Sequence, residues 1–290
     1  MLDVVARGVR FNVIRMGQGE PILVLVHGLI MDSHASYYMS VAPALAKHAS
    51  VILYDLRGHG RSEQPPSGYT TGDMVADLAA ILDALDLREQ PVIVVGNSFG
   101  GHIALRFAVE HPARVRALVL LEAQSGVAEF GQEMAKVLAV DGVERDRKAN
   151  EIFGRWLSLH AARRQLVDDP AAIGAHEARR AATIDNVRQM QRRRRSPGVT
   201  TAEGLGNATT LVADLARAPA VPDEAIAGLR CPVLAIYGED SELREDAERF
   251  RRLLPGMELK LVPGMGHTIL LEATPQVRDA ILGWLARVVP

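Results

Sequence analysis

Apolar and polar positions along the chain follow two alternating patterns. Short runs rich in Val, Ile and Leu, typical of buried strands, alternate with longer segments whose apolar residues recur every three or four positions, as in helices. The strand-like runs are residues 10–16, 22–26, 50–54, 92–95, 117–121, 233–237 and 258–262. The helical patterns are residues 35–47, 71–85, 98–110, 244–254 and 275–288. This order predicts an α/β protein with a mostly parallel central sheet flanked by helices.

The alternation is interrupted between the fifth and sixth strand-like runs. Residues 124–228 are rich in Ala, Arg and Glu, contain no strand-like run, and carry several amphipathic helical patterns. We therefore predict one α/β core, formed by residues 1–123 and 229–290, with residues 124–228 inserted as a helical cap or lid over its site. No internal repeat or linker in the sequence indicates a second independent domain.

One predicted strand–helix junction carries a candidate nucleophile. The sequence Gly96-Asn-Ser98-Phe-Gly100 places the pattern G-x-S-x-G directly after a strand and directly before a helix. A sharp turn at this point lifts a serine hydroxyl clear of the sheet, and small residues on both sides avoid collisions with the neighbouring strand and helix. The following helix N-terminus also favours developing negative charge. Ser98 is the predicted nucleophile, and a purely structural glycine-rich turn is the alternative.

A second loop supplies candidate donors for an oxyanion hole. The strand-like run 22–26 is followed directly by His27, Gly28 and Leu29. In sites of this kind such a loop supplies one backbone N–H, and the residue after the nucleophile supplies the other. The predicted donors are therefore the amides of Leu29 and Phe99. His27 is interpreted as a structural residue, because an oxyanion loop depends on its shape more than on a titrating group.

The general base is expected after the last strand. There the sequence Gly264-Met-Gly266-His267 forms a glycine-rich loop between the run 258–262 and the final helical pattern. None of the other eight of the nine histidines has such a position. His267 is therefore the predicted base that accepts the proton of the Ser98 hydroxyl.

Together these segments resemble the α/β-hydrolase superfamily. The resemblance is carried by the His27-Gly28 loop, the turn around Ser98, the segment Asp-Leu-Arg-Gly-His-Gly-Arg-Ser at residues 55–62, and Gly-Met-Gly-His267. It covers the core, residues 10–122 and 230–290, and implies the α/β-hydrolase fold with a helical cap insertion. It also implies a structural role for residues 55–62. These motifs are specific for the fold and say little about the substrate.

The acid of a Ser–acid–His triad is the point at which the sequence departs from the superfamily. Most members have an aspartate three residues after the glycine that ends the strand equivalent to 233–237, and Ser241 occupies that position here, between Asp240 and Glu242. A minority take a glutamate from the end of the preceding strand, where this chain has Glu122. A carboxylate at a buried strand end also needs a partner. Glu122 is therefore the preferred acid, with Asp240 and Glu242 as alternatives.

A serine nucleophile points to acyl transfer, since the resembling dehalogenases and epoxide hydrolases use aspartate at this position. We expect a hydrolase that cleaves a small carboxylic ester through an acyl-enzyme on Ser98, with no cofactor and no metal. The alternatives are an acyl thioesterase acting on carrier- or CoA-bound substrates and a C–C bond hydrolase. The sequence Gly-Asn-Ser-Phe-Gly-Gly around Ser98 resembles the nucleophile turn of some C–C hydrolases. A binding protein without turnover is disfavoured, because it has no use for nucleophile, base and oxyanion loop together.

Composition and charge add few constraints. The chain has 290 residues, 48% of them hydrophobic and 23% charged, and a net charge of −2. This charge balance gives no reason to expect nucleic acid or a membrane as partner. The expected partner is the small-molecule acyl substrate that a serine nucleophile implies. Four consecutive arginines, residues 192–195, are interpreted as a solvated helix end rather than a site for an acyl carrier. A single cysteine, no signal-peptide pattern and no membrane-length apolar run lead us to expect a cytoplasmic enzyme.

Overall fold

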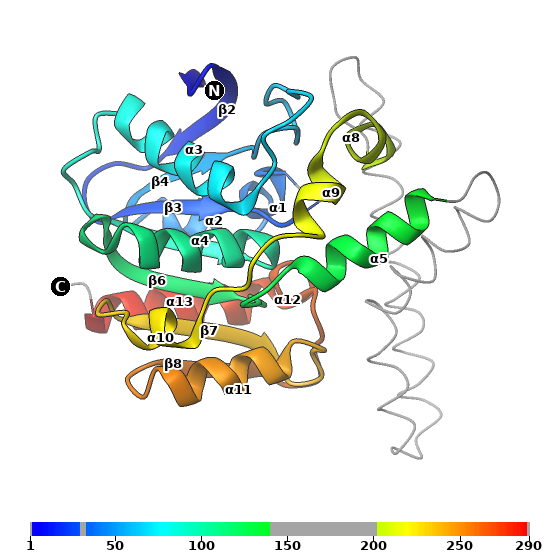
Figure 1. The fold of residues 1–290 in the computed structure, drawn as a ribbon. Coiled ribbons are helices and arrows are strands. Elements are labelled where there is room, and N and C mark those ends of the chain that lie inside the picture. Colours follow the sequence, from blue (N-terminus) through cyan, green and yellow to red (C-terminus); the bar gives the residue numbers. More distant parts are fainter. Residues whose placement is uncertain (1, 30–32, 140–201, 289–290) are drawn as a thin grey trace.

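A mixed sheet of eight strands forms the centre of the chain in the computed structural model, which describes residues 2–29, 33–139 and 202–288 (Figure 1). The strands are β1 (Leu2–Ala6), β2 (Val9–Met16), β3 (Ile22–Val26), β4 (Ser50–Tyr54), β5 (Val92–Asn97), β6 (Val115–Leu121), β7 (Val233–Gly238) and β8 (Glu258–Val262). Their order is β1-β2-β4-β3-β5-β6-β7-β8. Strands β3 to β8 pair in parallel, whereas β2 pairs antiparallel with both β1 and β4.

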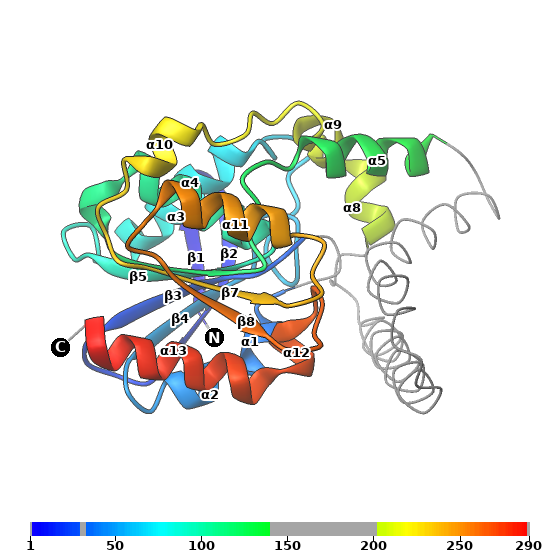
Figure 2. The same cartoon turned by 90° about the horizontal axis from the view of Figure 1, so that it is seen from below.

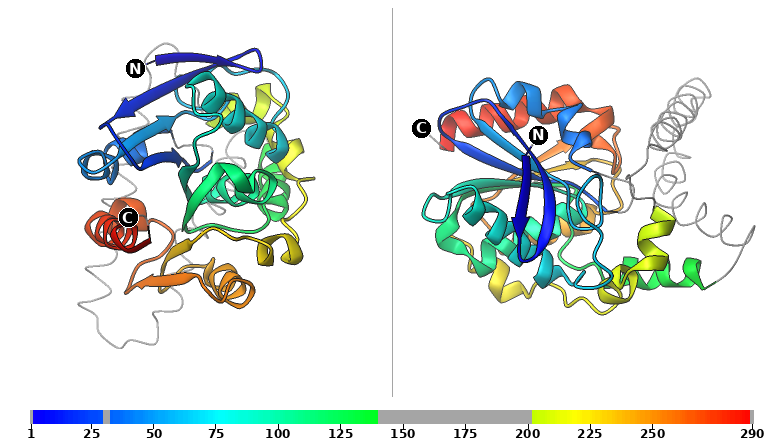
Figure 3. Two further views of the ribbon diagram at one scale, coloured as in Figure 1. Left: turned by 90° about the vertical axis from the view of Figure 1, so that its left-hand side faces the viewer. Right: turned by 90° about the horizontal axis from the view of Figure 1, so that it is seen from above.

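The sheet confirms the predicted mostly parallel architecture and adds one strand. All seven predicted strands are present, and β1 is the one that the sequence pattern did not reveal. Strand β1 lies at one edge of the sheet, where Figure 3 shows the dark blue β1–β2 hairpin opposite the orange β8 edge. Its side chains are only partly covered, and Leu2 and Val5 are exposed. An edge strand buries little surface, so its apolar pattern is short and weak.

Helices cover both faces of the sheet (Figure 2). One layer contains α3 (Thr71–Ala84), α4 (Phe99–Glu110), α10 (Asp223–Ala227) and α11 (Arg244–Leu253). The other contains α1 (Ala35–Tyr38), α2 (Ala42–Leu45), α12 (Ile269–Glu272) and α13 (Thr274–Val288). A short 3-10 helix, Pro112–Arg114, precedes β6. The single helix predicted over residues 35–47 is wrong. Pro43 lacks the N–H that a continuous helix requires and its ring obstructs the preceding turn, so two short helices form instead.

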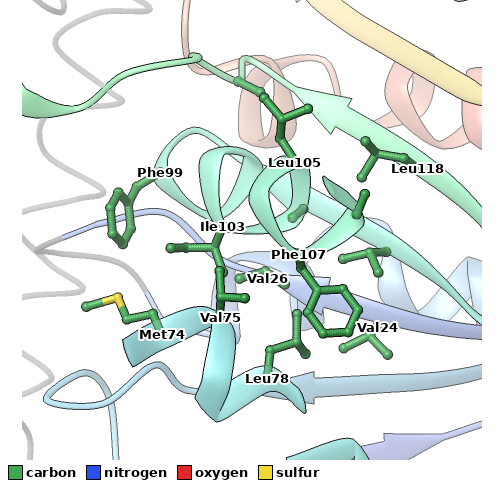
Figure 4. Close-up of a cluster of buried hydrophobic side chains, with 14 of the residues drawn as sticks. Val24, Val26, Met74, Val75, Leu78, Phe99, Ile103, Leu105, Phe107 and Leu118 are labelled. Carbon is green, nitrogen blue, oxygen red and sulfur yellow. The ribbon is translucent and has the colours of Figure 1, made fainter. Parts of the chain in front are cut away.

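Two apolar cores lie between the sheet and these helix layers. All five residues of β3 are buried, and successive side chains of a strand point to opposite faces. Val24 and Val26 therefore pack in one core with side chains of α3 and α4, such as Leu78 and Phe107 (Figure 4). Leu23 belongs to the other core, which also contains residues of α2 and α13. Burial on both faces explains why the central strands are continuously apolar in the sequence.

The predicted insertion begins at the carboxyl end of β6 and leads back, through α10, to the start of β7. Its described helices are α5 (Ala128–Leu138), α8 (Ala202–Ala208), α9 (Leu211–Leu215) and α10. The first three lie beyond the carboxyl ends of β6 and β7, whereas α10 belongs to the layer that covers the sheet (Figure 1). Residues 140–201, including the arginines at 192–195, lie outside the described residues. The division into a core and a cap over residues 124–228 therefore stays a prediction.

The two ends of this insertion are hydrogen-bonded to each other. The N–H of Val221 donates to the carbonyl of Ser125 at 2.8 Å. Asp246 of α11 accepts both the N–H and the hydroxyl of Ser125, each at 3.0 Å. Arg249 of the same helix donates to the Ser125 hydroxyl and to Asp223. Both connections between core and insertion are thus fastened to one core helix.

The described helices include none with the length and apolar character needed to cross a bilayer.

A buried ion pair links the segment 55–62 to α3. Arg57 donates to both carboxylate oxygens of Asp77, at 2.5 and 2.6 Å, and the two side chains are 5% and 2% exposed. Arg7 also donates to Asp77 at 2.9 Å. Because this carboxylate serves two guanidinium groups, it is the central member of the cluster.

Replacing Asp77 by alanine should therefore destabilise the fold strongly. The change leaves the Arg57 charge buried without its partner, and loss of one member of such a pair costs about 3–5 kcal/mol of unfolding free energy. Urea denaturation followed by circular dichroism measures the loss. Asp279→Ala is the control, because Asp279 is 66% exposed and should change stability little. Equal stability of the two variants would show that the buried pair contributes nothing.

Candidate active site

Ser98 occupies a tight turn between β5 and α4. Its backbone has φ 54° and ψ −120°, a conformation that residues with side chains rarely adopt. The Ser98 N–H donates to the carbonyl of Leu121 at 2.8 Å, and the Ser98 carbonyl accepts the N–H of Gly101 at 2.9 Å. A Cβ on Gly96 would clash with the backbone of Gly100, and one on Gly100 with the backbone of Val26. The glycines of the motif are therefore required by the close packing of the turn, as the sequence indicated.

His267 lies next to this serine although the two residues are 169 positions apart in the chain. The imidazole Nε2 is 3.0 Å from the Ser98 hydroxyl oxygen, within hydrogen-bonding distance. His267 lies on the loop between β8 and α12. This loop packs closely on the end of β7, since a Cβ on Gly238 would clash with the backbone of Met265. The structure thus brings together the predicted nucleophile and the predicted base.

Glu122 reaches the other nitrogen of the same imidazole. It follows β6 directly, is fully buried, and has a positive φ of 48°. Its Oε1 accepts the N–H of Gly238 at 2.5 Å, and its Oε2 accepts the hydroxyl of Ser241. The same Oε2 lies 3.5 Å from Nδ1 of His267. The buried carboxylate is thus held by two donors beside the imidazole.

A second carboxylate lies on the same side of the ring. Glu242 Oε1 is 3.3 Å from Nδ1 of His267, and the Glu242 side chain is 13% exposed. Asp240, the third predicted alternative, donates its backbone N–H to the carbonyl of Met265 at 2.9 Å and so ties down the loop that carries the histidine. The geometry therefore brings Glu122 and Glu242 together at His267.

Ser241 has a part in this arrangement that the sequence did not reveal. At the sequence level Ser241 indicated only that the usual aspartate is absent. In the structure its hydroxyl donates to Glu122, and the same oxygen accepts the N–H of Leu243 at 3.1 Å. A small hydroxyl residue at this position is the one signal that could have suggested a glutamate arriving from the neighbouring strand.

The candidate oxyanion donors lie at the same edge of the sheet as Ser98. Phe99 is the first residue of α4, and Leu29 follows β3 after two residues. Strands β3 and β5 are adjacent and parallel, with Val26 paired to Gly96, so both loops leave the sheet at neighbouring points. Residues 30–32, the continuation of the first loop, lie outside the described residues. The donor role of Leu29 and Phe99 stays a prediction.

The geometry of His27 agrees with a structural role. Its Nε2 accepts the N–H of Leu56 at 3.0 Å, so Nδ1 carries the proton and donates to the carbonyl of Gly28 at 2.6 Å.

The buried Asp55, close to His27, accepts N–H groups from the backbone of His34 at 2.8 Å and of Arg61 at 2.9 Å. Burial alone would raise the pKa of Asp55, but the hydrogen bonds from the His34 ring and from the backbone N–H of Arg61 lower it below its usual value. Asp55 is thus a charged anchor for both loops.

The two carboxylates also change the proton affinity of His267. Burial of the ring lowers its pKa, but the hydrogen bond that the ring donates to Glu122 and the charges of Glu242 and Glu122 raise it by more. The net effect places the pKa of His267 above the ordinary histidine value of 6.5. The imidazolium form is therefore stabilised at this site.

Comparisons with known proteins agree with this architecture. Residues 21–274 match the family described as alpha/beta hydrolase fold. The chain belongs to this family. It is 32% identical over 279 residues to a 2-hydroxy-6-oxo-2,4-heptadienoate hydrolase of Pseudomonas putida, an alignment that covers 93% of this chain and 90% of the relative.

A second relative and a solved structure are also similar to this chain. A 2-hydroxymuconate semialdehyde hydrolase of Pseudomonas sp. strain CF600 is 35% identical over 178 residues, which span 61% of this chain and only 60% of that relative. The structure of a thermophilic esterase from Thermogutta terrifontis, with malate bound, has a TM-score of 0.74 at 22% identity and covers 100% of this chain, with 99% of the esterase covered. The latter shows the shared fold alone. The protein is an α/β hydrolase, an enzyme of the hydrolase class.

The raised pKa of His267 is directly measurable. An NMR titration of its imidazole should give a midpoint above pH 6.5, and Glu122→Gln should lower it, because the neutral amide removes a charge that stabilises the imidazolium. Since the pKa is higher in the folded than in the unfolded protein, this interaction stabilises the fold fully below the unfolded value, and the contribution is lost as pH rises through the folded value. A midpoint below 6.5 in the unmodified protein would contradict the expectation.

Proposed function

We propose that this hydrolase attacks an activated carbonyl carbon with Ser98, that His267 is its general base and that Glu122 is the acid partner of His267. The observation that carries the proposal is the 3.0 Å separation between the Ser98 hydroxyl and His267 Nε2, with the Glu122 carboxylate on the opposite nitrogen of the ring. A nucleophile within hydrogen-bonding reach of a base, itself oriented by a third group, is the arrangement that covalent catalysis requires.

The chemistry proceeds in two halves. His267 Nε2 accepts the hydroxyl proton as the Ser98 oxygen attacks the carbonyl carbon, and Glu122 stabilises the resulting imidazolium. The amides of Leu29 and Phe99 stabilise the negative charge on the former carbonyl oxygen. His267 then gives its proton to the leaving group, which leaves an acyl group on Ser98. A water molecule then gives a proton to His267 and attacks the acyl carbon. His267 returns this proton to the Ser98 oxygen as its bond to the acyl group breaks, which releases the acid and restores the serine.

The proposed substrate is a small carboxylic ester. An ester carbonyl is attacked readily by a serine alkoxide, and its alcohol leaves once it is protonated by His267. The thioesterase alternative depends on the arginines at 192–195 as a binding site for a carrier phosphate. These residues lie outside the described residues, so the alternative rests on the sequence alone.

A C–C bond hydrolase is the second candidate, and a specific observation favours it. The relative from P. putida, which aligns over 93% of this chain, is named as a hydrolase of 2-hydroxy-6-oxo-2,4-heptadienoate. The Gly96-Asn-Ser98 turn also resembles the turns of some C–C hydrolases. The same nucleophile and base serve this reaction, but the leaving group is then a carbon atom that must receive a proton.

The mechanism predicts how variants of the two central residues behave. Ser98→Ala and His267→Ala should each fold normally and lower kcat by about 10³-fold or more, because each removes a member of one catalytic unit. The double variant should be little slower than either single variant. Ser67→Ala changes an exposed serine and should leave the rate unaltered. Initial rates measure the loss of turnover in each variant, and labelling by a fluorophosphonate measures the loss of the reactive serine. Near-normal turnover by folded Ser98→Ala would exclude the mechanism.

The substrate class is decided by comparing kcat/KM for two probes under the same conditions. We expect hydrolysis of p-nitrophenyl acetate, a short aryl ester, with rates that fall as the acyl chain lengthens. 2-Hydroxy-6-oxo-2,4-heptadienoate is the competing probe, and Ser98→Ala is the blank for both. A higher kcat/KM for the dienoate would replace the ester proposal by the C–C hydrolase.

A further inference from the structure

The Nδ1 atom of His267 faces two carboxylates rather than one. Glu122 Oε2 lies at 3.5 Å and Glu242 Oε1 at 3.3 Å. The two residues come from different elements, because Glu122 follows β6 and Glu242 lies in the loop between β7 and α11. One acid is sufficient to orient a histidine. The second carboxylate therefore needs a separate explanation.

Glu122 is tightly constrained by groups other than the histidine. Its two oxygens accept the Gly238 N–H and the Ser241 hydroxyl, and its own N–H donates to the carbonyl of Ile236 at 3.0 Å. Oε2, the oxygen of Glu122 that faces the imidazole, also accepts the hydrogen bond from the Ser241 hydroxyl. Its negative charge is thus shared between two donors. Glu122 is well suited to fix the position of the ring, but only part of its charge is directed at Nδ1.

Glu242 has a different environment on the same side of the ring. Its side chain is 13% exposed, so its charge is screened less than that of a surface carboxylate. The turn that carries it is held by the Ser241 N–H, which donates to the carbonyl of Gly238 at 3.2 Å, and by the Leu243 N–H, which donates to the Ser241 hydroxyl. The backbone on both sides of Glu242 is therefore fixed relative to the end of β7.

We propose that Glu242 is a second acid partner of His267 that acts jointly with Glu122. Glu122 sets the orientation of the ring, and Glu242 adds the charge that stabilises the imidazolium formed when Ser98 loses its proton. Glu242 is thus a positioning residue that acts through His267. This inference rests on the proposed roles of Ser98 and His267.

The joint action has a kinetic signature. While one carboxylate remains, it still stabilises the imidazolium, so either single replacement leaves part of the effect. Removing both leaves the charged ring without an acid partner from this pair. The loss in kcat/KM for the double variant should therefore exceed the product of the two single losses, in contrast to a single acid with a spectator beside it.

The experiment compares Glu242→Gln, Glu122→Gln and the double variant. Each protein is assayed for kcat/KM against pH with p-nitrophenyl acetate, or with the dienoate if that is the better substrate, and the His267 imidazole is titrated by NMR. Glu245→Gln is the matched control, because Glu245 undergoes the same chemical change three residues further on, at an exposed position of α11. Glu242→Asp retains the charge and tests whether charge, rather than side-chain shape, is what matters.

Glu242→Gln is expected to lower the His267 midpoint by roughly one pH unit, which moves the acid limb of kcat/KM to lower pH. Glu242→Asp should keep the midpoint close to that of the unmodified protein, and Glu245→Gln should leave it unchanged. An unchanged midpoint and rate in Glu242→Gln would overturn the inference. Full activity of Glu122→Gln combined with an inactive Glu242→Gln would also overturn it, because Glu242 would then be the only acid.

The two proposals fail in distinguishable ways. Turnover by folded Ser98→Ala would refute the proposed function through the rate alone. The NMR midpoint of His267 does not depend on turnover, and it therefore decides whether Glu242 stabilises the imidazolium even in that case.

Discussion

The parallel pairing of β5, β6 and β7 is the interaction on which the site depends. Its register places Asn97 opposite Leu121, and Leu121 opposite Ile236, and these are the last paired positions between the neighbouring strands. The next residue of each strand then donates its N–H one strand across, from Ser98 to Leu121 and from Glu122 to Ile236. Hydrogen bonds of the sheet itself thus determine where Ser98 and the buried carboxylate of Glu122 leave it. The histidine loop, packed on the end of β7, completes the arrangement.

Both residues that leave the sheet in this way have a backbone conformation that is unfavourable for a side chain. Ser98 and Glu122 have φ values of 54° and 48°, and such conformations cost about 1–3 kcal/mol each. They persist because the surroundings allow little else, with glycines packed against neighbouring backbone and carboxylate oxygens held by fixed donors. The strain turns each side chain away from the sheet and toward the imidazole. Strain of this kind is typical of functional sites, where the geometry matters more than local stability.

Much of this arrangement could be predicted from sequence, since local patterns carry it. The strand–Gly-x-Ser-x-Gly–helix order marked Ser98, and a glycine-rich loop near the end of the chain marked His267, and the structure places the two side by side. The choice among the acids could not be made in this way. Which carboxylate reaches Nδ1 depends on the separation of β6 and β7 and on the direction of each side chain, and two of the three candidates arrive there. The missed strand β1 and the helix interrupted at Pro43 had weaker local signals.

The hydrogen bond between Val221 and Ser125 has a consequence for how such an enzyme diversifies. Because the chain leaves the core and returns to it at adjacent points, both fastened to α11, the distance that the intervening segment must bridge is constant whatever its length. Insertions or deletions between these points change the closure entropy only slowly with length. The strand ends that bear Ser98 and Glu122 keep their register meanwhile. We therefore expect that the segment between these points can change in length and sequence while Ser98 and Glu122 keep their positions.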